Sequence, residues 1–253
     1  MNFEAIVGHH VLDHTILPLF TAGGVRFALT KHLLMLWGAG GLLLLLALLS
    51  RGSSRPARLL RGALEATVLF IRDGVVDPVL GHAGRPYLHY FATLFLFILF
   101  CNLGGLIPYG ATATGNVAVT AALASCTFGL ILLAGTRAQG LGGFLVHLVP
   151  GGLPWPLIPF MFVIEALGLV TKCFALTIRL FANMIAGHIV ALGFFSLIFT
   201  FAAAGKWAGL AAAPFSVALV VFVYLLEVLV CTLQAYIFTM LTAVFVSGAL
   251  HPH

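Results

Sequence analysis

The sequence predicts an all-α membrane protein that crosses the bilayer about five times. Of its 253 residues, 62% are hydrophobic and only 8% are charged, whereas soluble domains contain roughly 25% charged residues. The mean hydropathy is +1.15. Several uninterrupted apolar runs reach the roughly 20 residues that a helix needs to cross about 30 Å of hydrocarbon. These features predict a polytopic protein whose solvent is the lipid bilayer.

The surplus of basic residues has a topological explanation. A formal net charge of +5 would also suit a nucleic-acid-binding protein. Most of the Lys and Arg residues flank apolar runs, as topology-determining residues do, so we expect no nucleic-acid partner. The four cysteines lie far apart within apolar runs and form neither a zinc-site pattern nor a disulfide framework. We therefore expect no cofactor and no metal.

Three apolar runs have the length of ordinary transmembrane helices. The first covers residues 32–50 and follows an N-terminal segment at 1–31. The second and third, at 87–107 and 117–136, are separated by the turn-rich, uncharged sequence PYGATATGN. We predict one crossing from each run.

The segment 51–86 mixes arginines with apolar residues at helical spacing. This pattern is typical of an amphipathic helix that lies in the membrane interface; a solvated linker is the alternative. Its arginines place the segment on the inside, that is, the cytoplasmic or matrix side, so residues 1–31 are expected outside. They are Arg51, Arg55, Arg58, Arg61, Arg72 and Arg85. A second inside loop is expected at 137–156.

The last two apolar segments are too long for upright helices. Residues 160–204 contain no proline, and as one helix they would span about 68 Å at roughly 1.5 Å per residue. Residues 215–246 would span about 48 Å by the same rise. Both lengths exceed the bilayer core. We therefore predict a steeply tilted hairpin over 157–249, with its helices joined by AAAGKWAGLAAAP.

Charged residues inside this hairpin are candidates for function, because an intramembrane charge costs at least about 2.5–3.5 kcal/mol at a helix centre. Glu165, Lys172 and Arg179 are seven residues apart and lie within about 40° of one another on a helix. Asn183 continues the stripe. Glu165 and Lys172 have the alternative of pairing along the helix or snorkelling. Arg179 lies deeper and keeps its proton at any accessible pH.

The last apolar segment carries a stripe of its own, formed by Tyr224, Glu227, Cys231, Gln234 and Phe238. Antiparallel pairing that places Gln234 level with Arg179 moves Glu227 about 10 Å outward. That is close to the depth of His188. A His188–Glu227 pair in a partly wet cavity can exchange protons near neutral pH; a purely structural hydrogen bond is the alternative.

The stretch LTIRLFANMIAGH at 176–188 resembles the signature of subunit a of rotary F-type ATP synthases, R-L-x-x-N-M with an ionisable residue five positions after the Asn. Three further stretches are similar to the same family: CNLGGLIP at 101–108, PLIPFMFVIEALGLVTK at 156–172 and LEVLVCTLQAYIFTMLTAVF at 226–245. The resemblance covers about residues 85–249. Many bacterial members have Glu at the position of His188 and His at that of Glu227, so the arrangement here resembles the mitochondrial type.

The resemblance implies a non-catalytic stator that conducts protons and grips a rotating ring of c subunits, the c-ring. Peripheral-stalk b subunits are implied as further partners. Arg179 matches the obligatory arginine, which would separate two offset proton half-channels. The implied proton path comprises Glu165, Lys172, Arg179, Asn183, His188, Glu227 and Gln234, with Asn102 and Tyr224 as supporting residues. No catalytic residue is implied.

Two other functions also use intramembrane polar residues. A self-contained ion-coupled transporter or channel would show internal repeats, which this sequence lacks. A membrane metalloenzyme needs three or four convergent ligands, and the deep helices offer only His188 and Glu227. The N-terminal cluster of His9, His10 and His14 is expected to be solvated rather than to bind a metal.

The expected ion is H⁺ rather than Na⁺, because a His–Glu pair suits a proton relay. The resemblance implies an energy-transducing membrane. We favour the bacterial inner membrane, with the mitochondrial inner membrane as the alternative.

Overall fold

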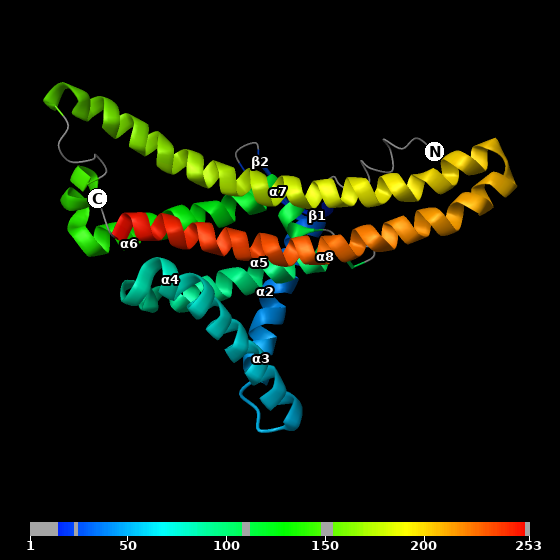
Figure 1. Ribbon diagram of the computed structural model, residues 1–253, viewed down its shortest axis with the longest axis horizontal. Coiled ribbons are helices and arrows are strands. Elements are labelled where there is room, and N and C mark those ends of the chain that lie inside the picture. Colours follow the sequence, from blue (N-terminus) through cyan, green and yellow to red (C-terminus); the bar gives the residue numbers. More distant parts are fainter. Residues whose placement is uncertain (1–14, 23–24, 108–111, 148–153, 251–253) are drawn as a thin grey trace. The chain divides into compact units, whose positions relative to one another are not determined.

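The computed structural model describes residues 15–22, 25–107, 112–147 and 154–250 (Figure 1). Within these residues, five helices are long and apolar enough to cross a membrane. This confirms the predicted all-α polytopic class. The strands and α-helices are β1 (Thr15–Ala22), β2 (Val25–Thr30), α2 (Lys31–Leu49), α3 (Arg55–Ile71), α4 (Asp77–Leu80), α5 (Leu88–Gly105), α6 (Val117–His147), α7 (Ile158–Ala204) and α8 (Lys206–Leu250). Four short helices of other types complete the order: η1 (Arg72–Val76), η2 (Gly81–Tyr87), η3 (Ala113–Gly115) and η4 (Trp155–Leu157).

A small antiparallel hairpin precedes the first long helix. β1 and β2 pair with Thr15 opposite Thr30 and Ala22 opposite Val25. The sequence-based architecture contains no strand here, although both segments are rich in β-branched and aromatic residues, which favour extended backbone. Thr30 then starts α2, because its hydroxyl accepts a hydrogen bond from the backbone N–H of Leu33 at 3.3 Å. The hairpin adds to the membrane helices without changing the class.

The chain forms two compact units. Unit 1 contains residues 1–42, 98–116 and 180–234, and unit 2 contains residues 43–97, 117–179 and 235–253. The long helices α7 and α8 each contribute to both units.

Unit 2 is built around the C-terminal part of α8. Three hydrogen bonds connect this part to other elements: Tyr236 donates to the Gly74 carbonyl at 3.3 Å, Ser247 to the Val79 carbonyl at 2.9 Å, and Gln139 to the Ala249 carbonyl at 2.9 Å. The fully buried side chains of unit 2 come from α3, η1, α5, α6 and α8, and include Ile71, Val75, Phe91, Ile131, Phe238 and Val246. In lipid such close packing and hydrogen bonding hold helices together, since lipid is as apolar as the side chains.

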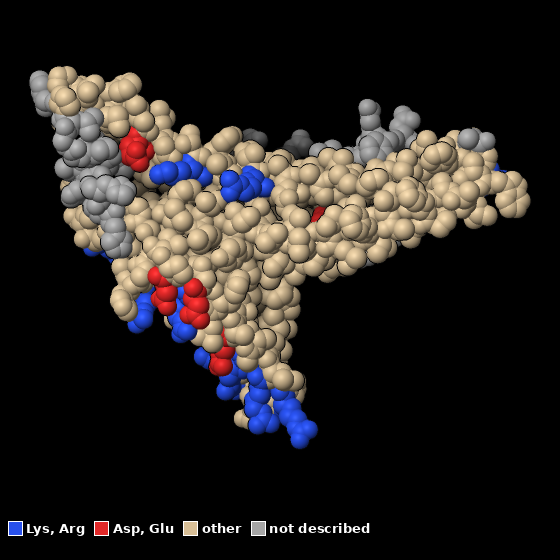
Figure 2. Space-filling view, in the orientation of Figure 1, with Lys and Arg blue, Asp and Glu red and all other residues tan. Residues whose placement is uncertain are grey.

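The amphipathic segment begins with a capped helix. Ser54 accepts a hydrogen bond from the Ala57 N–H at 3.4 Å, and Pro56 occupies the first turn of α3. Arg61 donates two hydrogen bonds to the Ser50 carbonyl, which fixes the turn between α2 and α3. One face of α3 is buried at Ala57 and Ile71, and Figure 2 shows basic side chains gathered over α3 and the turn before it.

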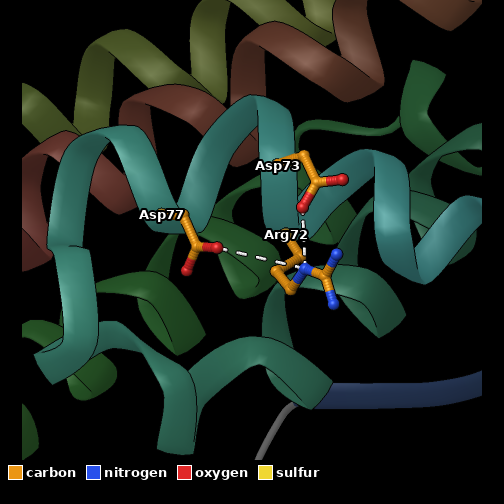
Figure 3. A network of polar contacts seen from close by, with 3 residues as sticks. All are labelled: Arg72, Asp73 and Asp77. Carbon is orange, nitrogen blue, oxygen red and sulfur yellow. Dashed lines mark hydrogen bonds and ion pairs between the residues drawn. The ribbon is translucent and has the colours of Figure 1, made fainter.

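The π-helical turn η1 lets α3 continue into α4 with a local ion-pair network (Figure 3). The Arg72 guanidinium donates to the Asp73 carboxylate at 2.7 Å and lies 3.9 Å from that of Asp77. All three side chains are more than a third exposed, so solvent screens the network and it adds little to stability. Its arginine is compensated locally by Asp73 and Asp77.

The loop predicted at 137–156 is wrong over its first part, which belongs to helix α6. The helix continues beyond residue 136 to His147 and is interrupted only at Gly140, where φ is 75° and ψ is 162°. Glycine adopts such a conformation readily because it has no Cβ. Phe144 then packs against Gly135, where a side chain would not fit. Residues 137–147, predicted as part of a loop, therefore form a helical segment after a kink at Gly140.

Helices α7 and α8 are longer than predicted. They contain 47 and 45 residues, about 70 and 68 Å at roughly 1.5 Å per residue. The predicted connection AAAGKWAGLAAAP is helical on both sides of Gly205, which has a φ of 155°, and Pro214 lies inside α8. The two helices approach closely at this turn because residue 209 is a glycine. A Cβ at that position would lie only 2.7 Å from the Cβ of Ala202.

Candidate functional site

The parts of α7 and α8 in unit 1 form an antiparallel hairpin with a defined register. The sulfur atoms of Met184 and Cys231 lie 4.0 Å apart. One turn farther along α7, a Cβ on Gly187 would lie 2.8 Å from the carboxyl carbon of Glu227. This register places His188 at the level of Glu227, as the helix-depth argument predicts.

Glu227 is the most unusual side chain of this hairpin. It is only 6% exposed, and neither carboxyl oxygen has a hydrogen-bond partner among the described residues. Its carboxyl group occupies the space that a side chain on residue 187 would fill, so Gly187 provides the site for it. A buried, unpartnered charge costs several kcal/mol. A carboxyl group in this position is therefore a candidate for binding and releasing a proton.

His188 is held from another direction. Its Nε2 atom is within hydrogen-bonding distance of the Thr112 hydroxyl. The alternative of a structural hydrogen bond between His188 and Glu227 is not seen: the two residues share a level, but the imidazole contacts the segment before α6 and the carboxyl lies against the α7 backbone at Gly187. Their role as a proton-exchanging pair stays a prediction.

Asn102 connects the same segment to α8. Its side-chain oxygen accepts a hydrogen bond from Thr114 at 2.7 Å, and its amide nitrogen donates to the Cys231 carbonyl at 3.4 Å. Asn102 and Thr114 are completely buried. A buried polar network of this kind is stabilising because each of these groups has a partner.

The other predicted residues of unit 1 differ in exposure. Gln234 is 6% exposed, and its amide nitrogen has no partner among the described residues. Asn183 is half-buried and Tyr224 is exposed. The predicted pairing of Gln234 with Arg179 stays a prediction.

Glu165 and Lys172 form the ion pair that was the alternative to a proton-path role. Their charged groups are 3.9 Å apart along α7, and each side chain is 39% exposed. The Lys172 ammonium also lies 5.6 Å from the centroid of the Phe245 ring, a distance that allows a cation–π interaction. Two partners thus compensate the lysine charge.

Arg179 has no compensating charge among the described residues. Its side chain is exposed, and no hydrogen bond or ion pair joins it to any residue in the described ranges. The neighbours on its helical stripe are small and also exposed: Ala175, Ala182 and Ala186. The guanidinium is therefore available to a group outside this chain.

Comparison with known proteins decides the family. The family model described as ATP synthase A chain matches residues 33–247. The chain belongs to the ATP synthase A chain family. ATP synthase subunit a of Chloroherpeton thalassium is 43% identical over 257 residues, which cover 95% of this chain and 75% of that protein. ATP synthase subunit a of Myxococcus xanthus is 46% identical over 236 residues, covering 91% and 75% of the two chains.

A third relative, ATP synthase subunit a 2 of Chlorobaculum tepidum, is 41% identical over 96% of this chain and 72% of its own length. These comparisons confirm the resemblance inferred from the sequence motifs. With the five apolar helices, they make the chain a multi-pass membrane component of an ATP synthase.

In this member of the ATP synthase A chain family, sequence reasoning missed Thr112, Thr114 and Gly187. The two threonines lie in the stretch predicted as a turn-rich loop, and nothing in their spacing points to His188. Gly187 had a weak signal, since a glycine beside His188 in a helix interior costs about 1 kcal/mol relative to alanine. Among the described residues, no group of three or more His, Cys, Asp and Glu could hold a metal. The cluster of His9, His10 and His14 lies outside them.

Proposed function

We propose that this chain is the proton-conducting stator subunit a of an F-type ATP synthase. The family supports its place in the complex. The observation that carries the proton path is the buried carboxyl of Glu227, which has no hydrogen-bond partner in the described part of the chain and lies at the level of His188 in one hairpin. Both groups can gain and lose protons, and a proton relay needs such groups at the same depth in the membrane.

Arg179 is the proposed boundary between two half-channels. Its guanidinium stays charged at any accessible pH, so a c-ring carboxylate that reaches it must give up its proton, and a free proton meets a fixed positive barrier. The exposure of Arg179 and of the small residues Ala175 and Ala182 supports this role, because small side chains let another helix approach closely. A lysine could lose its charge there and accept a proton.

The outer half-channel passes His188 and Glu227. Protons from the outside load a ring carboxylate through these groups, with Asn183 and Gln234 as polar neighbours nearer Arg179. The inner half-channel releases protons past the Glu165–Lys172 pair. That pair keeps one face of α7 polar, which suits a path that water can enter.

The expected partners are the c-ring, the peripheral-stalk b subunits, protons and the lipid bilayer. We place the protein in the inner membrane of a bacterium, since the relatives compared above are bacterial. The second candidate, a self-contained transporter, needs no other chain.

One experiment separates these candidates. Membranes carrying the tagged chain are dissolved in a mild detergent, and the chain is purified with whatever is bound to it. We expect an oligomeric ring and a soluble ATPase head to co-purify, and the purified complex in proteoliposomes should acidify the lumen when ATP is added. A chain that purifies alone and transports protons without ATP would instead establish the transporter.

A further inference from the structure

The segment before α6 is buried far more deeply than a connecting loop requires. Thr112 is 4% exposed, and Ala113 and Thr114 are completely buried. Two backbone hydrogen bonds close a tight turn around them, from Gly115 to the Thr112 carbonyl at 2.9 Å and from Asn116 to the Ala113 carbonyl at 3.3 Å. This turn, residues 112–116, has no part in the proton path proposed above.

Three contacts join the turn to the hairpin and to α5. Thr112 contacts the Nε2 atom of His188, and Thr114 donates to Asn102. Asn102 in turn donates to the carbonyl of Cys231, one helical turn from Glu227. The turn is therefore attached to α7 through an imidazole and to α8 through an amide. This arrangement keeps the Thr112 hydroxyl in a fixed position.

A hydroxyl group suits a histidine that changes its protonation state. The Thr112 oxygen can donate its hydrogen to a neutral imidazole nitrogen, and it can accept a hydrogen bond from the same nitrogen when the ring is protonated. A backbone carbonyl could only accept, and an ammonium group could only donate. The Thr112 hydroxyl can thus hold the His188 ring through a cycle of proton uptake and release.

Gly105, the last residue of α5, leaves the space that Thr112 fills. A Cβ on Gly105 would collide with the side-chain oxygen and the backbone of Thr112. The preceding residue, Gly104, has nothing within 4 Å of the same position. These adjacent glycines therefore provide a matched pair, in which a methyl group displaces Thr112 at one position and reaches open space at the other.

We propose that Thr112 is a positioning residue for His188. It holds the imidazole in place in both protonation states, and the Thr114–Asn102–Cys231 connection and the space at Gly105 keep Thr112 in position. The proposal rests on the proton path of the preceding section and adds the group that orients its histidine.

The test replaces the hydroxyl without changing the size of the side chain. Thr112→Val puts a methyl group in place of the hydroxyl, and Thr112→Ser keeps the hydroxyl. The control is Thr239→Val, because the buried Thr239 hydroxyl donates to the Ala235 carbonyl of its own helix and to no other group in the described ranges. ATP-driven acidification is measured in inverted vesicles, with the amount of assembled complex determined by immunoblotting. His188→Ala is measured alongside.

We expect Thr112→Val to slow acidification about ten-fold per assembled complex, as loss of a hydrogen bond to an ionisable group does. Thr112→Ser should keep at least about half of the wild-type rate, and Thr239→Val should match the wild type. Rescue by serine separates positioning by the hydroxyl from simple packing. Equal losses in the valine and serine variants would overturn the proposal.

A wild-type rate in Thr112→Val beside a strong loss in His188→Ala would also overturn it, and the proposed proton path would stand. Wild-type rates in both variants would overturn the path as well. If Thr112→Val fails to assemble, Gly105→Ala and Gly104→Ala decide. A loss in Gly105→Ala alone supports the positioning role, and equal rates in the two alanine variants contradict it.

Discussion

The two ends of the long hairpin treat their ionisable residues differently. In unit 1, Glu227 is buried without a hydrogen-bond partner among the residues that the structure describes, and His188 contacts a hydroxyl group from a distant segment. In unit 2, Glu165 and Lys172 are paired with each other and each is 39% exposed. The protonation of a buried ionisable group without a partner depends strongly on the groups around it. An exposed ion pair contributes only roughly 0–1 kcal/mol to stability. Proton transport should therefore be more sensitive to substitution of Glu227 than to substitution of Glu165 or Lys172.

Of the substitutions that test this comparison, Glu227→Gln is expected to have the largest effect. Glu227→Gln keeps the shape of the side chain but removes its ability to bind and release a proton. We predict at least about a hundred-fold loss of ATP-driven acidification, equivalent to roughly 2.7 kcal/mol. Glu165→Gln, the matched change in unit 2, should cost less than about three-fold. Similar losses of acidification in Glu227→Gln and Glu165→Gln would contradict the expected difference between these two carboxyl groups.

A smaller effect is expected when the space around Glu227 is filled. Gly187→Ala places a methyl group 2.8 Å from the Glu227 carboxyl carbon, and such overpacking costs about 1–3 kcal/mol. We predict a loss of acidification of about ten-fold. Gly193→Ala is the control, because nothing lies within 4 Å of that position. It should stabilise α7 by up to about 1 kcal/mol through helix propensity. Both variants are compared by thermal unfolding in detergent and by their acidification rate. Equal unfolding temperatures and equal rates in Gly187→Ala and Gly193→Ala would contradict the prediction.

The smallest effect is expected at Lys172. Lys172→Met removes the ion pair with Glu165 and the contact with the Phe245 ring but keeps a long side chain. We predict a change in thermal stability of less than about 1 kcal/mol and acidification within about two-fold of the wild type. A large loss of flux with normal assembly would show that the inner half-channel depends on this lysine as strongly as the outer one depends on Glu227.

Helices of ordinary length could be predicted well because apolar runs define them. The run at 32–50 corresponds to α2, and the amphipathic pattern after it to α3 and the turns that follow. The errors occurred at 137–147 and 206–214, which were predicted to connect helices but are themselves helical. Gly140 kinks α6 without ending it, and Pro214 lies within α8. Local propensity alone does not show whether a helix resumes after a single irregular residue.

Helix geometry allowed the depth of the site residues in the hairpin to be predicted, but not their contacts. The rise per residue was enough to bring His188 and Glu227 to one level. It could not show that Glu227 lies against Gly187, because that depends on how the faces of the two helices meet. Thr112 reaches His188 from 76 residues away in the chain, a tertiary contact that no local pattern encodes.

Arg179 provides the most direct test of the proposed mechanism. Proton flux is measured in inverted vesicles with Arg179→Ala and Arg179→Lys, first with ATP and then passively after the ATPase head has been stripped off. We predict that assembled Arg179→Ala complexes lose ATP-driven pumping and leak protons along a gradient, because the fixed positive barrier is gone. Arg179→Lys should leak less, since its ammonium is charged part of the time. Normal ATP-driven pumping by assembled Arg179→Ala complexes would contradict the assignment of Arg179 as the boundary between two half-channels.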